Sequence, residues 1–99
     1  MNVVLTAEAA GDLDRIASYI AAENPARALS FVRELRQRCE GLAHTPKAFP
    51  VLARYEHSGV RRLVHGNYLI FYVVGETDIA ILHILHGAMD YEAVLFPSR

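Results

Sequence analysis

The sequence predicts an α+β fold: an N-terminal strand, an antiparallel helical hairpin packed on a small antiparallel β-sheet, and a short C-terminal tail. Two observations predict it. Apolar side chains recur at helical spacing in the first half of the chain, and residues 60–90 read as three short apolar strands joined by tight turns. The length of 99 residues suits one modest core, so residues 1–99 are expected to form a single domain.

The N-terminal segment predicts a strand followed by a helix. Residues 3–5 are apolar and β-prone, and Thr6 has a side chain suited to cap the next helix, with Glu8 in its first turn. That helix places four apolar side chains on one face: Leu13, Ile16, Ala17 and Ile20.

A second amphipathic helix follows at once. Asn24 is suited to cap it and Pro25 to occupy its first position. A link this short between two helices predicts an antiparallel hairpin. Cys39, on this second helix, is the single cysteine of the chain, so an intrachain disulfide is excluded. It is expected to be buried rather than reactive. The apolar stripe of this helix consists of Ala28, Phe31, Val32, Leu35, Cys39 and Leu42.

Residues 44–59 predict an ordered loop. Pro46 and Pro50 restrict the residues that precede them to extended conformations. Phe49, Val51 and Leu52 are expected to attach the loop to the core.

The strands that follow are joined by a two-residue turn at Gly66 and a longer turn over residues 75–78. Period-two alternation predicts that the last strand divides its side chains between two apolar faces. One face is expected to lie under the helical hairpin, and the other under the C-terminal tail, a partner or a second subunit. The predicted faces are Ile79, Ile81, His83 and Leu85 against Ala80, Leu82, Ile84 and His86.

Charge and hydropathy limit the class of function. Residues 45–75 carry four basic side chains and one acidic one, a local cationic patch that is consistent equally with an anionic partner and with an ordinary solvated surface. Four charges are far fewer than dedicated nucleic-acid binders carry, so direct DNA binding is not expected. No apolar run approaches a bilayer span and no signal peptide is evident, so the cytoplasm is the expected location, without membrane contact.

The sheet carries the side chains best suited to bind a partner or to take part in a reaction. The two histidines of the last strand lie three residues apart, which on a strand points the rings away from each other, so no metal site is expected, and no cofactor. The residues predicted to bind a protein partner are Arg54, Arg61, Arg62, His65, Tyr72, His83 and His86.

Three segments resemble the ParE branch of the RelE/ParE toxins, the toxic halves of bacterial type II toxin–antitoxin pairs. They are LTAEAAGDLDRIASYIAAENPARALSFVRELRQRCEGL, GVRRLVHGNYLIFYVV and AILHILHGAMD, of which the last two are the more specific. The resemblance implies a small toxin whose helical hairpin packs on an antiparallel sheet, and a co-encoded antitoxin that neutralises it.

The resemblance also implies two alternative mechanisms. RelE-like members cut messenger RNA on the ribosome and usually carry an arginine in a YRIFY-like run, where this chain has Leu69. Many relatives read ILRILHGARD in the last strand, where this chain has His83 and Met89 in place of the arginines. ParE-like members act on DNA gyrase by binding, and the loss of cations favours that branch over phosphodiester cleavage.

Three hypotheses remain open at this point. The first is a gyrase-binding toxin, which is not an enzyme. The second is a ribosome-dependent endoribonuclease, whose catalytic residues would be His83, Arg61, Arg62 and Tyr68. The third is an attenuated toxin that folds and binds only its antitoxin. Growth arrest upon expression separates the third hypothesis from the first two.

Overall fold

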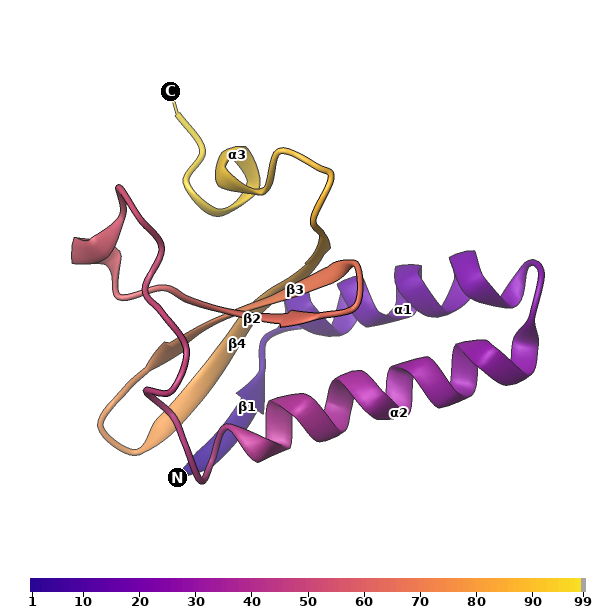
Figure 1. Ribbon diagram of the computed structural model, residues 1–99, viewed down its shortest axis with the longest axis horizontal. Helices are drawn as coiled ribbons and strands as arrows, with labels where there is room; N and C mark the ends of the chain where they lie inside the picture. Colours follow the sequence, from indigo (N-terminus) through magenta and orange to yellow (C-terminus); the bar gives the residue numbers. More distant parts are fainter. Residues whose placement is uncertain (99) are drawn as a thin grey trace.

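The computed structural model describes residues 1–98 and confirms the predicted fold class (Figure 1). Strand β1 (Asn2–Leu5) is followed by helices α1 (Ala7–Ala21) and α2 (Pro25–Gly41). A short 3-10 turn, η1 (Glu56–Ser58), precedes β2 (Arg61–His65), β3 (Tyr68–Val74) and β4 (Asp78–His86), and helix α3 (Tyr91–Leu95) ends the fold.

The helix ends are built by the predicted caps. The Thr6 side chain accepts a hydrogen bond from the Ala9 amide at 3.2 Å, and its hydroxyl also donates to the Ile81 carbonyl at 2.7 Å. Asn24 caps α2 by accepting from the Arg27 amide at 3.0 Å, with Pro25 in the first turn. Thr6 therefore joins the start of α1 to the sheet as well as capping it.

The sheet has the order β1-β4-β3-β2 and is mixed. The pairs β2–β3 and β3–β4 are antiparallel, as expected, but β1 pairs with β4 in parallel, from Asn2 opposite Asp78 to Leu5 opposite Ile81. Gly66 opens the β2–β3 turn with φ 59°, a conformation that glycine adopts without steric cost.

The prediction that successive side chains of β4 alternate between the two faces of the sheet along the whole strand was wrong. Phe71 lies opposite His83 and Tyr72 lies opposite Ile81, so Leu82 is an additional residue without an opposite partner on β3. Such a bulge shifts the alternation by one residue. Ile84 consequently joins Ile79 and Ile81 beneath the helices, while Leu85 packs in the cluster on the opposite face.

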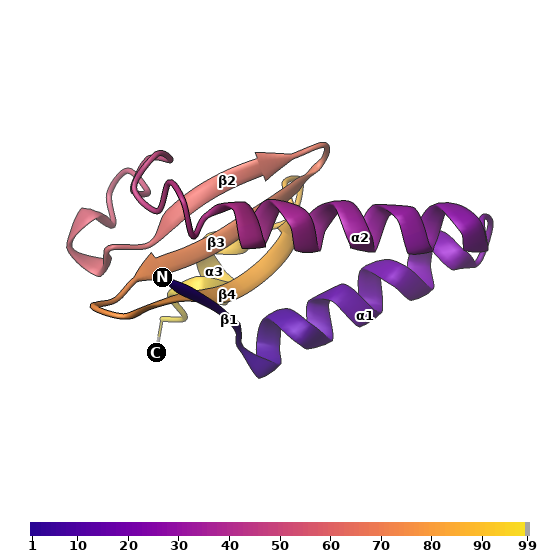
Figure 2. The same cartoon turned by 90° about the horizontal axis from the view of Figure 1, so that it is seen from below.

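The two faces of the sheet are covered by different elements. Figures 1 and 2 place the helical hairpin on one face and α3 on the other, with the tip of the hairpin projecting beyond the sheet. The hairpin face carries the larger core cluster, which includes Leu13, Leu35, Ile70, Tyr72 and Ile81. The C-terminal tail thus provides the second cover that the sequence left open, and Asp90 caps its helix.

The larger core includes Cys39, which is buried as expected. Burial raises the pKa of its thiol to about 11, so the thiol is protonated at neutral pH. Every helix within residues 1–98 is too short or too polar to span a lipid bilayer.

Candidate functional site

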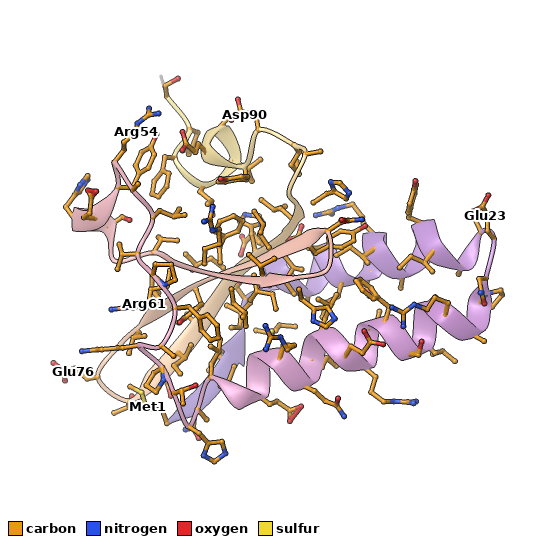
Figure 3. All side chains as sticks on the ribbon, viewed as in Figure 1. Met1, Glu23, Arg54, Arg61, Glu76 and Asp90 are labelled. Atoms are coloured by element: carbon orange, nitrogen blue, oxygen red, sulfur yellow. The ribbon has the colours of Figure 1, made fainter. Side chains whose placement is uncertain are left out.

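The structure distributes the predicted site residues over three separate regions. Figure 3 shows Arg54 beside the C-terminal helix and Arg61 well away from it, near the loop that follows α2. Arg61 and Arg62 project from opposite faces of β2, as adjacent residues of a strand do. The remaining predicted residues of the last strand, His83 and His86, lie on β4, and β3 separates β4 from β2.

The first region holds the loop of residues 43–50 against the hairpin face. The Arg61 guanidinium donates to the Phe49 carbonyl at 2.6 Å, and the Tyr72 hydroxyl donates to the Pro46 carbonyl at 2.9 Å. Tyr72 is fully buried, and burial raises the pKa of its hydroxyl. Both side chains therefore fasten a loop, and Tyr72 contributes nothing to the surface.

The second region lies around α3 on the opposite face. Arg62 donates to the Tyr91 hydroxyl at 3.4 Å, and the Arg54 guanidinium lies 4.0 Å from the Glu92 carboxylate. Both arginines therefore contact the C-terminal helix, with a hollow of about 280 Å³ between that helix and residues 50–53.

The third region contains a buried carboxylate that the sequence analysis missed. Asp12, on α1, is only 2% exposed and is the single charged side chain that is buried within the described residues. One of its oxygens accepts from the Ile84 amide at 2.9 Å and contacts the His83 Nδ1 at 2.8 Å. Its other oxygen accepts from Arg15. Asp12 thus joins α1 to β4 at the bulge.

A signal for Asp12 was present in the sequence. It lies between Ala9 and Ile16 at helical spacing, so a carboxylate occupies the apolar stripe of the first helix. Burying a carboxylate is costly unless its oxygens are hydrogen-bonded, so its position predicts partners on the sheet. Those partners lie more than 70 residues away, and only the fold identifies them.

The His83–Asp12 contact fixes how the imidazole is presented. Because a carboxylate oxygen accepts, we assign the hydrogen to Nδ1 of His83, which leaves Nε2 as the nitrogen that can accept a proton. His83 is 19% exposed and lines a hollow of about 280 Å³ with Arg15, Tyr68 and His86. A base oriented by a carboxylate is therefore present, but without Arg61 or Arg62 beside it.

A row of rings continues from this hollow toward the hairpin tip. The Tyr68 ring lies 5.2 Å from His86 and 5.5 Å from Phe31, and Phe31 lies 5.6 Å from His65. The Arg27 guanidinium lies 5.0 Å from the centre of the Phe31 ring. These contacts connect α2 with the strands β2, β3 and β4.

Glu34, on α2, contacts both Arg27 and His65 of this row. Its carboxylate accepts from Arg27 at 2.6 Å and contacts His65 Nε2 at 3.1 Å. The hydrogen bonds from Arg27 and then from His65 hold the pKa of Glu34 below its ordinary value. His65, predicted as a binding residue, is thus largely engaged in holding the helix to the sheet.

Tyr68 and His86 line a second, larger hollow of about 710 Å³ between the hairpin tip and the β2–β3 turn. The two hollows are adjacent, since both are lined by Tyr68 and His86, and we call them together the helix-side groove. Its lining includes Asp12, Arg15, His83 and Met89 at one end and Tyr19, Ile20, Arg27, Phe31 and Asn67 at the other, with Tyr68 and His86 between. Residues 1–98 contain no cluster of three potential metal ligands.

Comparisons with known proteins identify relatives of the whole fold. Residues 3–91 match the family model described as the ParE toxin of the type II toxin–antitoxin system parDE. The chromosomal ParDE toxin–antitoxin system of P. aeruginosa contains a similar chain, with a TM-score of 0.71, 26% sequence identity and coverage of 87% of this chain and 95% of that chain.

A second solved structure supports the fold alone. A chain of the RelBE2 toxin–antitoxin complex of Mycobacterium tuberculosis has a TM-score of 0.64 and 22% identity, with coverage of 86% of this chain and 95% of that chain. No curated protein sequence matches.

Proposed function

We propose that this chain, which belongs to the ParE toxin family of type II toxin–antitoxin systems, inhibits DNA gyrase by binding and is neutralised by a co-encoded antitoxin. Its site of action would then be the cytoplasm. The observation that carries the proposal is the family match, which extends over residues 3–91 and therefore includes α1, α2 and, apart from Asn2, all four strands.

The arrangement of cations also favours binding over RNA cleavage. Stabilising a phosphorane requires cations positioned around one reacting phosphate. Arg61 and Arg62 point to opposite faces of β2 and are engaged with the 43–50 loop and with Tyr91, and the position of the strand arginine is taken by Leu69, which is buried. The described residues thus offer His83 only Arg15 as a neighbouring cation.

Purified, antitoxin-free protein tests the proposal on supercoiled plasmid with DNA gyrase. We expect dose-dependent loss of supercoiling activity, with protein-linked linear DNA if binding traps the cleavage complex. The same protein bound to its antitoxin is the matched control and is expected to be inactive. Unchanged supercoiling with folded protein in excess over gyrase would falsify the gyrase proposal.

One observation favours endoribonuclease activity as a second candidate. The buried Asp12 holds His83 with Nε2 free, an arrangement suited to a general base. If the protein cleaves ribosome-bound messenger RNA, His83→Gln should lower the cleavage rate at least about a hundredfold, as loss of a general base does. Unchanged cleavage in that variant excludes His83 as the base.

A further inference from the structure

We propose that three cations, Arg38, Lys47 and Arg61, form a docking site for an acidic surface of the protein that this toxin inhibits. The inference rests on the proposed function, which supplies a protein target, and it adds the place on the toxin and the chemistry of the surface that is bound. Arg38 comes from α2, Arg61 from β2, and Lys47 from the loop of residues 43–50 between them. We call these three residues the cationic cluster.

Contacts with residues 47–49 bring the cationic cluster together. The Arg61 guanidinium donates to the carbonyl of Phe49 at 2.6 Å and to that of Lys47 at 3.4 Å. The Arg38 guanidinium lies 6.0 Å from the centre of the Phe49 ring and donates to the Val64 carbonyl at 3.0 Å. Both guanidinium groups therefore lie against the short segment that carries Lys47.

The structure divides the cationic patch of residues 45–75 and adds a member from the hairpin. Arg54 and Arg62 contact the C-terminal helix instead. Lys47 and Arg61 remain together at the loop, and Arg38 joins them from outside that stretch of sequence. Only the fold identifies these three residues as one surface feature.

The charge of the cationic cluster is not neutralised by an ion pair within residues 1–98, because every ion pair there involves other cations. Arg38 and Arg61 donate to uncharged main-chain carbonyls, which hold the side chains and leave their charge in place. Glu76 and Asp78, at the end of the β3–β4 hairpin, form no ion pair within the described residues. The cluster therefore attracts an anionic partner and disfavours a cationic one.

The loop that carries Lys47 is fixed before a partner arrives. The Tyr72 hydroxyl donates to the Pro46 carbonyl at 2.9 Å, and the Arg62 amide donates to the Pro50 carbonyl at 3.1 Å, so contacts hold the loop on both sides of Lys47. A fixed loop loses less conformational entropy on binding than a mobile one, so more of the contact energy appears as affinity. Within the cluster, Arg61 fastens the loop, while the exposed Lys47 and Arg38 can reach a partner.

The charge of the whole chain favours a protein surface over a nucleic acid as the partner. The formal net charge is -1 at pH 7. Binding to nucleic acid depends on many phosphate contacts and is typical of strongly basic domains. Three cations on a chain without excess positive charge suit a local match with a few carboxylates on a protein.

Arg33, on the same helix as Arg38, provides the matched control. It is exposed and lies two residues before the buried Leu35, which on a helix places it on the side that faces away from the core. It forms no ion pair within residues 1–98. Lys47→Glu and Arg33→Glu thus change the net charge equally at two separate places.

The experiment measures the concentration of toxin that halves the supercoiling of plasmid DNA by gyrase. Lys47→Glu should raise this concentration about tenfold, because a repelling charge replaces an attracting one, and Lys47→Arg should keep the wild-type value. Arg38→Gln keeps an N–H group for the Val64 carbonyl but loses the charge, and should also raise it. Arg33→Glu should change it by less than about twofold. All three positions are exposed, so the variants should fold, which circular dichroism checks.

The possible outcomes separate the inference from the proposed function. If the wild type does not inhibit gyrase, the proposed function fails and the inference fails with it. If the wild type inhibits gyrase and both Lys47→Glu and Arg38→Gln inhibit it equally well, the docking site alone is overturned. It is also overturned if Arg33→Glu loses as much inhibition as Lys47→Glu, since net charge would then explain the loss.

Two further measurements test whether the acidic surface belongs to the target. The affinity of the antitoxin for Lys47→Glu should equal its affinity for the wild type. Lost antitoxin affinity with full gyrase inhibition would assign the cationic cluster to the antitoxin and overturn the inference. The wild type should not bind plasmid DNA without gyrase. Binding that Lys47→Glu abolishes would assign the cluster to nucleic acid instead.

Discussion

The two faces of the sheet are covered in different ways. On one face two long helices supply buried side chains along their length, including Leu13, Ile16 and Leu35. On the other, a five-residue helix and the loop before β2 rest on a smaller cluster that includes Leu69, Phe71 and Leu85. The hairpin face is therefore stabilised by continuous packing, while the α3 face depends on a few side-chain contacts at its edges.

The contacts on the α3 face include two between aromatic rings and one hydrogen bond. The Phe96 ring stacks on Tyr55 with centroids 4.0 Å apart, and Tyr91 lies 5.0 Å from Phe71. Arg62 reaches the Tyr91 hydroxyl at 3.4 Å. Because of this difference, we expect a substitution of given size to lower the free energy of unfolding far more beneath the hairpin than beneath α3.

Leu35→Ala should have the largest effect. Leu35 is fully buried in the centre of the hairpin core, and its truncation should lower the free energy of unfolding by about 2–5 kcal/mol in urea denaturation. Leu29→Ala, on the same helix but exposed, should cost less than about 0.5 kcal/mol. A loss below about 1 kcal/mol for Leu35→Ala would contradict the assignment of the hairpin face as the main core.

Asp12→Ala should cause the second-largest loss in the free energy of unfolding. The change leaves the Ile84 amide and the His83 Nδ1 without their partner and should cost about 1–3 kcal/mol. Asp12→Asn keeps an oxygen that can accept from the Ile84 amide, so its loss should be smaller. Equal losses in the two variants would mean that the charge, rather than the hydrogen bond to β4, is what stabilises the structure.

Phe96→Ala should affect only the weaker face. It removes the stack on Tyr55, a contact of a kind worth about 0.5–1.5 kcal/mol beyond the area that it buries. Hydrogen exchange should accelerate in residues 91–95 and leave the amides of α2 unchanged. Faster exchange throughout the hairpin would show that the two faces unfold as one unit.

Glu34→Gln should have the smallest effect, with a defined dependence on pH. The pKa of Glu34 is lowered in the folded protein, so its carboxylate stabilises the fold above its ordinary pKa of 4.5 and loses that contribution as the pH falls through the folded value. The wild type should therefore be more stable than the variant at pH 6, and the gap should close below pH 4.5. A stability difference between the wild type and the variant that widens as the pH falls would contradict this prediction.

Local signals predicted the helices and the turns. Thr6 and Asn24 cap their helices through neighbouring amides, and Gly66 forms its turn within four residues, so a short window of sequence contains the interactions that specify them. The parallel pairing of β1 has no such window, because it joins strands from opposite ends of the chain. The bulge at Leu82 depends on the register of the whole β3–β4 hairpin, which no single residue of the sequence indicates.

The site was less predictable than the fold for the same reason. His83 and His86 were recognised as residue types suited to a site, but their surroundings come from α1, α2 and the β2–β3 turn. The two most prominent cations, Arg61 and Arg62, are bonded to the 43–50 loop and to α3, which the sequence did not indicate, and their role in binding a partner stays a prediction. Sequence identified the chemical groups, and only the packing of the helices determined which of them share a groove.

The parallel pairing of β1 with β4 has a consequence for synthesis on the ribosome. Thr6 and Asp12 bond to residues that lie 71 to 76 positions later in the chain, so neither contact can form until β4 has left the exit tunnel. Contacts this distant in sequence also slow folding, because a long loop must close first. A nascent chain can therefore form its two helices early, whereas its first strand to be translated is among the last to find a partner.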